Sequence, residues 1–170
     1  MSALLPTLDN EIDRRVADLV AARPDWPCRT GCDACCRSLA EPLRLTAAEW
    51  RRLEAGLEAL PPEERSTVEA RLADAARGSE RPHICPFLDR RRGRCRVYAH
   101  RPIACRTYGF YRGRDGGRFC GLVAETIEET ESEATGPSSG TQVIWGNHDA
   151  VERRLERDAG PSIPLADWWG

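Results

Sequence analysis

The chain has 170 residues, of which 41% are hydrophobic, which is enough for one domain with a modest core. Its formal net charge of −2 argues against a general binder of polyanions. Every basic residue is arginine, which excludes a Schiff-base lysine, a phosphate-loop lysine and a lysine general base.

Neither a membrane span nor a secretory signal is expected. No apolar run approaches the ~18–20 residues that a membrane span requires. Acidic residues at positions 9, 11 and 13 interrupt the first fifteen residues before a long apolar stretch can develop. We therefore expect no membrane association and a reducing, cytoplasmic environment.

Three helices are predicted in the first half of the chain. Residues 7–22 carry apolar side chains at helical spacing, and a proline ends the pattern. A second helix is expected over 46–60, because Thr46 and Glu49 form a capping box. Two prolines break that helix and begin a third over 62–77, so the pair makes a helical hairpin.

Short β-hairpins are predicted in the second half. Residues 84–98 form the first, around a turn at 90–93, with a cysteine on each arm. The dipeptide at 101–102, Arg-Pro, opens a helical turn. Residues 110–120 form the second hairpin, with the turn at 115–117.

The remaining chain is acidic at first and then loop-like. An acidic stretch covers 125–133, and a Gly/Pro/Ser-rich linker or loop covers 136–140. A last helix is expected over 147–158. We expect the tryptophans at 168–169 to pack onto the core, the alternative being a terminal interaction peptide.

Eight cysteines are the most informative residues of the chain. They fall in one tight cluster and one looser set, and they are Cys28, Cys32, Cys35, Cys36, Cys85, Cys95, Cys105 and Cys120. In a reducing compartment such clustering favours metal binding over disulfides or buried thiols. Thiolates two or three residues apart can bind one metal, because the intervening backbone wraps around it. A metal shared by the two distant groups would link the two ends of the helical hairpin and contribute to folding.

These motifs together resemble the YkgJ family of cysteine-cluster proteins, the zinc- or iron-chelating CxxCxxCC domain. The resemblance spans about residues 28–120 and rests on the cluster Cys28-x3-Cys32-x2-Cys35-Cys36, on Cys85-Pro86-Phe87-Leu88, on Cys95 with Val97-Tyr98, and on Arg101-Pro102 with Cys105-Arg106 and Tyr108. It implies a bound zinc or iron. Flagellin lysine N-methylases are similar over the same region and are associated with an iron–sulfur cluster. In this chain three residues separate Cys28 from Cys32, where the family name implies two.

The adjacent pair Cys35 and Cys36 favours iron–sulfur over a single zinc. Adjacent side chains diverge by about 100° in a helix and point to opposite faces of a strand, so they share one ion only awkwardly. Either one of the two is a ligand, or the site holds several metals, as a cluster does. The spacing of Cys28, Cys32 and Cys35 also matches the radical-SAM motif, but the chain is too short for the accompanying barrel.

Arginines, histidines and one isolated cysteine are further candidates near the cysteine motifs. Arg101 and Arg106 flank Cys105 and are candidates for offsetting the negative charge of a thiolate-bound centre. The aromatic residues among the neighbouring arginines form no stacking motif, so nucleic-acid binding is not expected. His83, His100 and His148 are read as surface or hydrogen-bonded side chains, with His83 the best of them as a ligand. Cys120 lies outside the tight motifs and can be either a ligand or a core thiol.

The expected fold is a small, mostly α (α+β) metal-organised domain, with a helical hairpin and short β-hairpins around a cysteine-ligated centre. Residues 1–135 would form the metal-binding domain, with its core at 28–120, and 136–170 a linker, helix and tail packing on the same domain. The expected function is an iron–sulfur protein, with a 4Fe-4S cluster or a Zn/Fe ion, in a redox or modification-support role with a protein or redox partner. The alternatives are a zinc-stabilised interaction module without catalysis and a component of a protein lysine methylation system.

Overall fold

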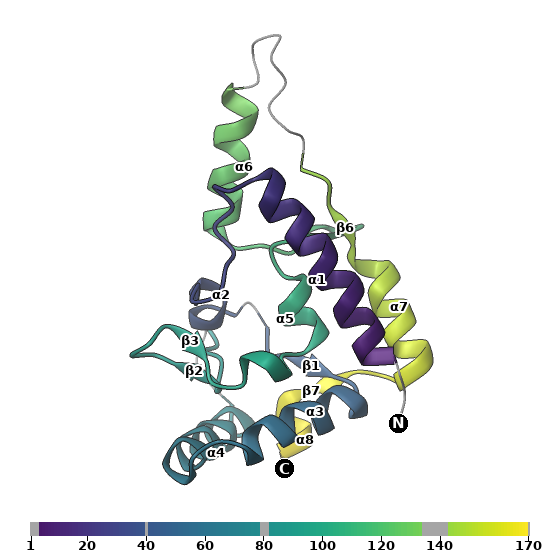
Figure 1. Ribbon diagram of the computed structural model, residues 1–170. Helices are drawn as coiled ribbons and strands as arrows, with labels where there is room; N and C mark the ends of the chain where they lie inside the picture. Colours follow the sequence, from purple (N-terminus) through teal and green to yellow (C-terminus); the bar gives the residue numbers. More distant parts are fainter. Residues whose placement is uncertain (1–3, 40, 79–81, 134–142, 170) are drawn as a thin grey trace.

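The computed structural model describes residues 4–39, 41–78, 82–133 and 143–169 (Figure 1). Its helices in chain order are α1 (Leu4–Ala22), α2 (Ala34–Arg37), α3 (Ala47–Glu58), α4 (Pro62–Ala76), the 3-10 turn Tyr98–His100, α5 (Ile103–Thr107), α6 (Gly121–Glu133), α7 (His148–Ala159) and α8 (Leu165–Trp169). Its strands are β1 (Arg44–Leu45), β2 (Leu88–Asp89), β3 (Arg94–Cys95), β4 (Tyr111–Gly113), β5 (Gly116–Gly117), β6 (Gly146–Asn147) and β7 (Ile163–Pro164). In the described part of the chain, no helix is long and apolar enough to cross a membrane.

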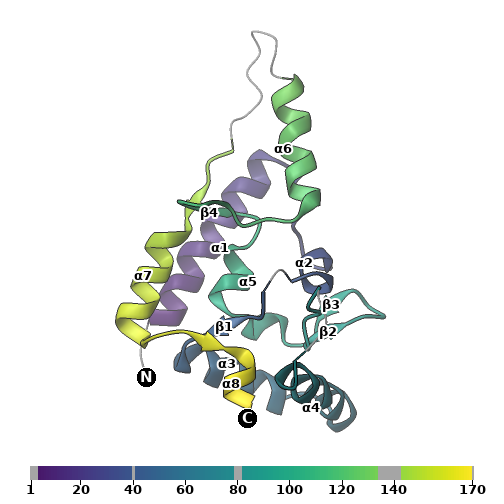
Figure 2. The same ribbon diagram turned by 180° about the vertical axis from the view of Figure 1, so that it is seen from behind.

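Two separate hydrophobic clusters organise the molecule. The first, here called the α3–α4 core, has as its buried members Leu45, Trp50, Leu53, Leu57, Val68, Leu72, Cys85, Phe87, Leu88, Val97 and Leu165. The second, here called the α1 core, has as its buried members Leu5, Leu8, Ile12, Leu19, Trp26, Ile103, Phe110, Tyr111, Val123 and Leu155. Figures 1 and 2 show α3, α4 and α8 at one end of the molecule, with α1, α5 and α7 next to them.

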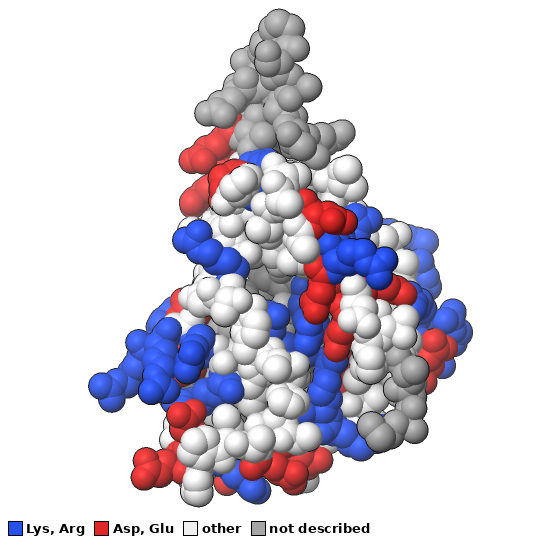
Figure 3. Space-filling view, viewed as in Figure 1, with Lys and Arg blue, Asp and Glu red and all other residues white. Residues whose placement is uncertain are grey.

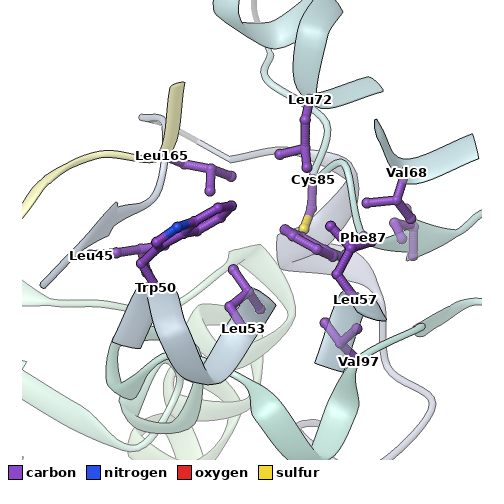
Figure 4. Packing of buried hydrophobic residues seen from close by; sticks show 11 residues of the cluster. Leu45, Trp50, Leu53, Leu57, Val68, Leu72, Cys85, Phe87, Val97 and Leu165 are labelled. Carbon is purple, nitrogen blue, oxygen red and sulfur yellow. The ribbon is translucent and has the colours of Figure 1, made fainter. Parts of the chain in front are cut away.

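The α3–α4 core forms as the sequence predicts. Thr46 and Glu49 make the expected capping box at the start of α3. Figure 4 shows Leu53 and Leu57 of α3 and Val68 of α4 around the Phe87 side chain. The α8 helix closes the cluster: Trp168 stacks on Trp50 with ring centroids 6.4 Å apart, and its indole N–H donates to the Leu45 carbonyl over 3.1 Å.

The α1 core is closed by a small three-stranded sheet. Strand β4 pairs antiparallel with β5 and parallel with β6, so the segment before α7 lies beside the second hairpin. The predicted first helix is confirmed, with Leu8 and Ile12 almost fully buried, although Val20 is 38% exposed. Helix α7 then packs against α1, where Arg154 pairs with Glu11 over 2.6 Å.

Several expectations need correction. The first hairpin is confirmed but has strands of only two residues each, and Cys85 precedes β2 instead of lying within it. In the second hairpin Gly116 and Gly117 form β5, so the turn consists of residues 114–115 instead of the predicted 115–117. The acidic stretch after Cys120 is a helix, α6, which extends away from the body in Figure 1. The predicted linker at 136–140 lies outside the described residues. Long helices with short strands confirm the expected α+β class.

Candidate metal centre

The first cysteine cluster begins at a loop that a tryptophan holds in place. Trp26 is 2% exposed, and its indole N–H donates to the Gly109 carbonyl over 3.2 Å. Its ring also contacts Trp145 edge-on, with centroids 5.8 Å apart. A bulky, buried anchor two residues before Cys28 therefore fixes where the cysteine segment leaves the α1 core. No motif in the sequence around Trp26 indicates this role.

Cys35 and Cys36 are consecutive residues of the short helix α2. Their Cα–Cβ bonds leave the helix about 100° apart, but the two thiols are still close enough to form a hydrogen bond. Helix α2 is stabilised by Arg37, whose Nε donates to Asp33 Oδ2 over 2.6 Å and whose Nη2 donates to the Arg90 carbonyl over 3.1 Å. These bonds also attach α2 to the turn of the β2–β3 hairpin.

Backbone pairing brings Cys36 and Cys85 together. The Cys85 amide donates to the Cys36 carbonyl over 2.8 Å, and Leu39 and His83 form an antiparallel bridge beside it. Cys95 joins them because it pairs with Leu88 in the β2–β3 register. Cys85 is buried within the α3–α4 core, as Figure 4 shows, and Cys36 and Cys95 pack against that core. Backbone contacts therefore bring Cys36 from before the helical hairpin close to Cys85 after it, while a metal shared by the two groups stays a prediction.

Cys105 lies on α5, whose position depends on a buried glutamate from α3. Glu49 is 2% exposed, and its Oε1 accepts a hydrogen bond from the Ile103 amide over 2.9 Å. Its Oε2 accepts from the Thr46 amide over 2.9 Å. One carboxylate thus caps the beginnings of two helices, α3 and α5. The capping box was predicted, whereas the bond to α5 was not.

Cys28 and Cys120 pack against the α1 core. Gly109 lies directly beside the Cys28 sulfur: its φ is +83°, and a Cβ built on it would fall 2.4 Å from Cys28 Sγ. A side chain at position 109 would therefore occupy the volume that the thiol now fills. Like Trp26, Gly109 has a place in the site that no local sequence signal revealed.

The thiol of Cys28 is surrounded by other thiols. Burial, together with the charges of Cys120, Cys32 and Cys35, raises the pKa of Cys28 to about 12. Burial and the charges of Cys120, Cys35 and Cys28 also raise the pKa of Tyr108. These four cysteines and Tyr108 are therefore electrostatic neighbours.

A second set of thiols interacts on the other side of α2. A hydrogen bond to Cys36 and burial raise the pKa of Cys35. The hydrogen bond between Cys35 and Cys36 acts to lower the pKa of Cys36. A hydrogen bond to Cys85, burial, and the charges of Cys85 and Cys95 have the larger combined effect, and they raise the pKa of Cys36 to about 12. Burial, with the charges of Cys36, Cys95 and Cys35, raises the pKa of Cys105. Cation binding to thiols that resist ionisation in this way would release protons.

Five of the eight predicted cysteines belong to or pack against one of the two cores, and electrostatic effects on the pKa values couple Cys32, Cys35 and Cys105 to them. The eight cysteines are here called the thiol array. Among the described residues, no three His, Cys, Asp or Glu side chains converge closely enough to hold a metal ion as they stand. The chemistry of the donor set nevertheless fits zinc or iron, because soft thiolates are the ligands that zinc and iron–sulfur clusters prefer. We therefore treat the array as a candidate ligand set.

The two candidate arginines differ in their surroundings. Arg101 lies over the Tyr98 ring, with its guanidinium carbon 3.5 Å from the ring centroid. Burial raises the pKa of both Cys95 and Cys105, and the charge of Arg101 opposes part of that rise. Arg106 instead faces α1: its Nε lies 3.1 Å from Asp9 Oδ1, and its Nη1 lies 3.2 Å from Asp13 Oδ1. Compensation of thiolate charge therefore stays a proposal, for which the contacts favour Arg101.

Many of the other arginines of this half are paired with carboxylates. Arg96 lies 2.5 Å from Glu64, and Arg92 lies within 4 Å of the same side chain. The exposed arginines of the β2–β3 turn form the blue projection beside α2 in Figure 3. Tyr98 connects this region to the first cysteine segment, because its hydroxyl accepts a hydrogen bond from Thr30 over 3.1 Å.

The three histidines have structural surroundings. His83 forms the backbone bridge with Leu39. The His100 ring packs against Gly56, so closely that a Cβ added to Gly56 would lie 2.7 Å from the ring. His148 is 1% exposed, and its Nε2 lies 2.9 Å from Glu152 Oε1.

The comparisons with known proteins agree with this site. Residues 27–134 match the family model described as "CxxCxxCC: Putative zinc- or iron-chelating domain". The match begins one residue before Cys28 and includes all eight cysteines. No curated protein and no solved structure matches the chain.

Proposed function

The chain belongs to the CxxCxxCC family of zinc- or iron-chelating domains, and from that premise we propose that it is an iron–sulfur protein with a redox or modification-support role. The observation that carries this proposal is the number of cysteines that the fold holds around α2. Cys35 and Cys36 lie on α2, the Cys85 amide donates to the Cys36 carbonyl, and the chain has eight cysteines in all. One mononuclear zinc site uses only four ligands, so the array holds more thiols than such a site needs.

The neighbouring thiols on α2 add support. Cys35 and Cys36 both have further cysteines as electrostatic neighbours, Cys28 for the first and Cys85 for the second. A multinuclear centre can use side chains that diverge, because its metal atoms lie in different directions. Such a centre supplies one-electron transfer when it is bound. The chain's own residues would hold it, shield it from water and, through Arg101, balance its charge.

Anaerobic purification of the full chain tests this proposal. We expect a brown protein with broad absorbance near roughly 400 nm, together with iron and acid-labile sulfide by elemental analysis. Cys35→Ser and Cys36→Ser should each diminish the absorbance. A colourless protein, free of iron and full of zinc, would overturn the iron–sulfur assignment and leave metal binding intact.

A zinc-stabilised interaction module is the second candidate. It is favoured by the position of the thiols, which contact both hydrophobic cores, because a closed tetrahedral zinc site contributes folding free energy without chemistry of its own. The zinc content measured in the same experiment separates the two candidates.

A further inference from the structure

We propose that a second site, separate from the cysteines, binds a small phosphate monoester. The site is a surface cavity of about 330 Å³ between β4, β6 and the start of α7. Three arginines, a tryptophan, an asparagine and an aspartate line it, and none of its lining residues is a cysteine: Arg112, Arg114, Trp145, Asn147, Asp149 and Arg153. The inference therefore goes beyond the metal-binding function and does not depend on it.

Strand pairing and one glycine build this cavity. Strand β4 pairs with β6 in parallel, which places Arg112 beside Asn147, where β6 leads into α7 (Figure 1). The Asp149 carboxylate, on the first turn of α7, accepts a hydrogen bond from the Arg114 amide over 3.1 Å. Gly113 leaves room for that carboxylate, because a Cβ built on Gly113 would lie 2.7 Å from Asp149 Oδ1. The backbone that carries the first two arginines is therefore fixed to the start of α7.

The charges in the cavity leave two arginines to bind a ligand. The Asp149 carboxylate already has a cationic neighbour, because Arg114 Nε lies 3.8 Å from Asp149 Oδ2. In the described part of the chain, neither Arg112 nor Arg153 has a carboxylate within 4 Å. Two such guanidiniums match a phosphate monoester, which carries a charge of about −1.5 to −2 at pH 7 and offers three acceptor oxygens.

The tryptophan of the cavity favours a ligand with an organic part. The partly buried Trp145 ring stacks on Phe119 with centroids 5.4 Å apart, and the Arg112 guanidinium carbon lies 5.5 Å from the Trp145 centroid. An apolar surface therefore lies next to a cation. A volume of about 330 Å³ falls within the range of small-molecule sites, roughly 300–1,000 Å³, so it admits a sugar or a base beside the phosphate group.

Titration calorimetry of the full, metal-loaded chain with AMP tests the site, and adenosine and inorganic phosphate serve as the two halves of that probe. We expect AMP to bind, and adenosine to bind at least about tenfold more weakly because it lacks the charged group. Inorganic phosphate should also bind more weakly than AMP, because it makes no contact with Trp145. Absence of AMP binding, or either half binding as tightly as AMP, would overturn the proposal.

Arginine substitutions locate the site. Arg112→Gln and Arg153→Gln should each weaken AMP binding about tenfold or more, because each removes charged hydrogen bonds. Arg114→Gln should weaken it less, since the charge of Arg114 is already paired within the cavity. The matched control is Arg157→Gln, which removes the same charge from α7 at a residue that pairs with Asp158 outside the cavity. Equal losses in the Arg153 and Arg157 variants would indicate general surface charge and overturn the proposal.

A variant that strengthens binding keeps the proposal testable if an arginine variant fails to fold. Asp149→Asn retains a side-chain oxygen that can accept from the Arg114 amide, and it removes a negative charge from the cavity. It should strengthen AMP binding about two- to fivefold, the size expected of one exposed charge interaction. Asp158→Asn makes the same charge change on α7 outside the cavity and should leave AMP binding unchanged. Equal effects of the two aspartate variants would contradict the proposal.

Metal content separates this inference from the proposed function. All of these variants should retain the metal of the wild-type chain, because none of the substituted residues is a cysteine. A chain that contains no iron but binds AMP in the expected way would refute the iron–sulfur role and support the phosphate site. An iron–sulfur chain that binds no AMP would support the iron–sulfur role and refute the phosphate site.

Discussion

Gly109 leaves the space that the Cys28 thiol occupies, and its carbonyl accepts the hydrogen bond from Trp26. Both features lie where the α1 core meets the cysteine segment. The φ of Gly109 is +83°, which also favours glycine at this position, because residues with a Cβ are sterically disfavoured at positive φ. At this scale the packing of a candidate ligand, Cys28, depends on a residue without a side chain.

We predict that Gly109→Ala destabilises the chain and weakens metal binding at Cys28. The backbone conformation alone costs about 1–2 kcal/mol for alanine, and displacing a packed neighbour costs a further ~1–3 kcal/mol. Denaturant unfolding and metal content of the full chain measure the two effects.

Gly160→Ala is the matched control for this change. Gly160 has the same φ of +83°, and a Cβ there would meet no heavy atom within 4 Å among the described residues. It should show only the backbone cost and keep its metal. Equal destabilisation and equal metal content in the two variants would argue against a role for the contact with Cys28.

Arg101 is the residue whose charge reaches two thiols, Cys95 and Cys105. We predict that Arg101→Glu weakens metal retention about 10–100-fold, the range typical of residues that support metal ligands, or shifts the reduction potential if iron is bound. Competition with a chelator of known affinity, or a redox titration, measures the effect. Arg91→Glu in the exposed β2–β3 turn should change neither quantity.

Arg106→Glu separates charge compensation from structural pairing. Because Arg106 pairs with Asp9 and Asp13, its replacement should lower stability by weakening the contact between α5 and α1 more than it lowers metal affinity. If the Arg91, Arg101 and Arg106 variants all lose metal equally, the effect is one of general surface charge.

Sequence reasoning at the residue scale found the cysteines but not their surroundings. Cysteine spacing is a local signal, because ligands that share a metal lie close together in the chain. Trp26 and Gly109 act through a contact across 83 residues, which no periodicity or motif encodes. The side-chain direction of Arg106 was equally inaccessible, since it depends on where α1 packs.

At the scale of elements, the position of α5 depends on hydrogen bonds from α3. The Glu49 carboxylate accepts from the Ile103 amide at the start of α5 and from the Thr46 amide at the start of α3. Arg52 on α3 adds a second link, because its Nη2 donates to the Arg101 carbonyl over 2.6 Å. The position of Cys105 is therefore set by helix α3.

We predict that Glu49→Ala lowers the free energy of unfolding by about 2–4 kcal/mol. The substitution leaves two buried amides without their acceptor, and each such group costs roughly 1–3 kcal/mol. Urea unfolding of the metal-loaded chain measures the loss. Glu54→Ala, at an exposed position on the same helix, should change stability by less than about 0.5 kcal/mol. Equal effects of the two substitutions would contradict the capping role.

Elements with strong local signals were predicted well, and those without them were not. The capping box at Thr46 and the prolines before α4 identified the helical hairpin. Helix α6 was missed because its acidic sequence has no cap or clear apolar stripe to indicate a helix. The parallel pairing of β4 with β6 places Tyr111 beside Gly146. This pairing was not predicted, because no local sequence pattern indicates a strand partner so distant in the chain.

At the scale of the whole molecule, five of the eight cysteines belong to or pack against two separate hydrophobic cores. The α3–α4 core and the α1 core are each too small to resemble a full domain core, and marginal cores are commonly reinforced by metal. Direct protein links between them include the bonds from Glu49 and Arg52 to the segment at Arg101–Ile103. Metal bound to thiols from both sides would be a further link, and a stronger one.

We therefore predict that metal removal sharply lowers the melting temperature of the full chain. Apparent binding free energies of structural zinc reach about 10–16 kcal/mol, comparable with the whole stability of a small domain at about 5–15 kcal/mol. A ligand that binds only the folded state adds its binding free energy to stability, so chelation should remove that contribution. Thermal unfolding before and after chelation, with metal content verified in both samples, measures the change, and re-addition of metal should restore the original transition. Because the α1 core and the α3–α4 core would then be joined only by protein contacts, the stripped chain should also unfold over a broader temperature range. An unchanged melting temperature after verified removal would show that the two cores do not depend on metal to stay together.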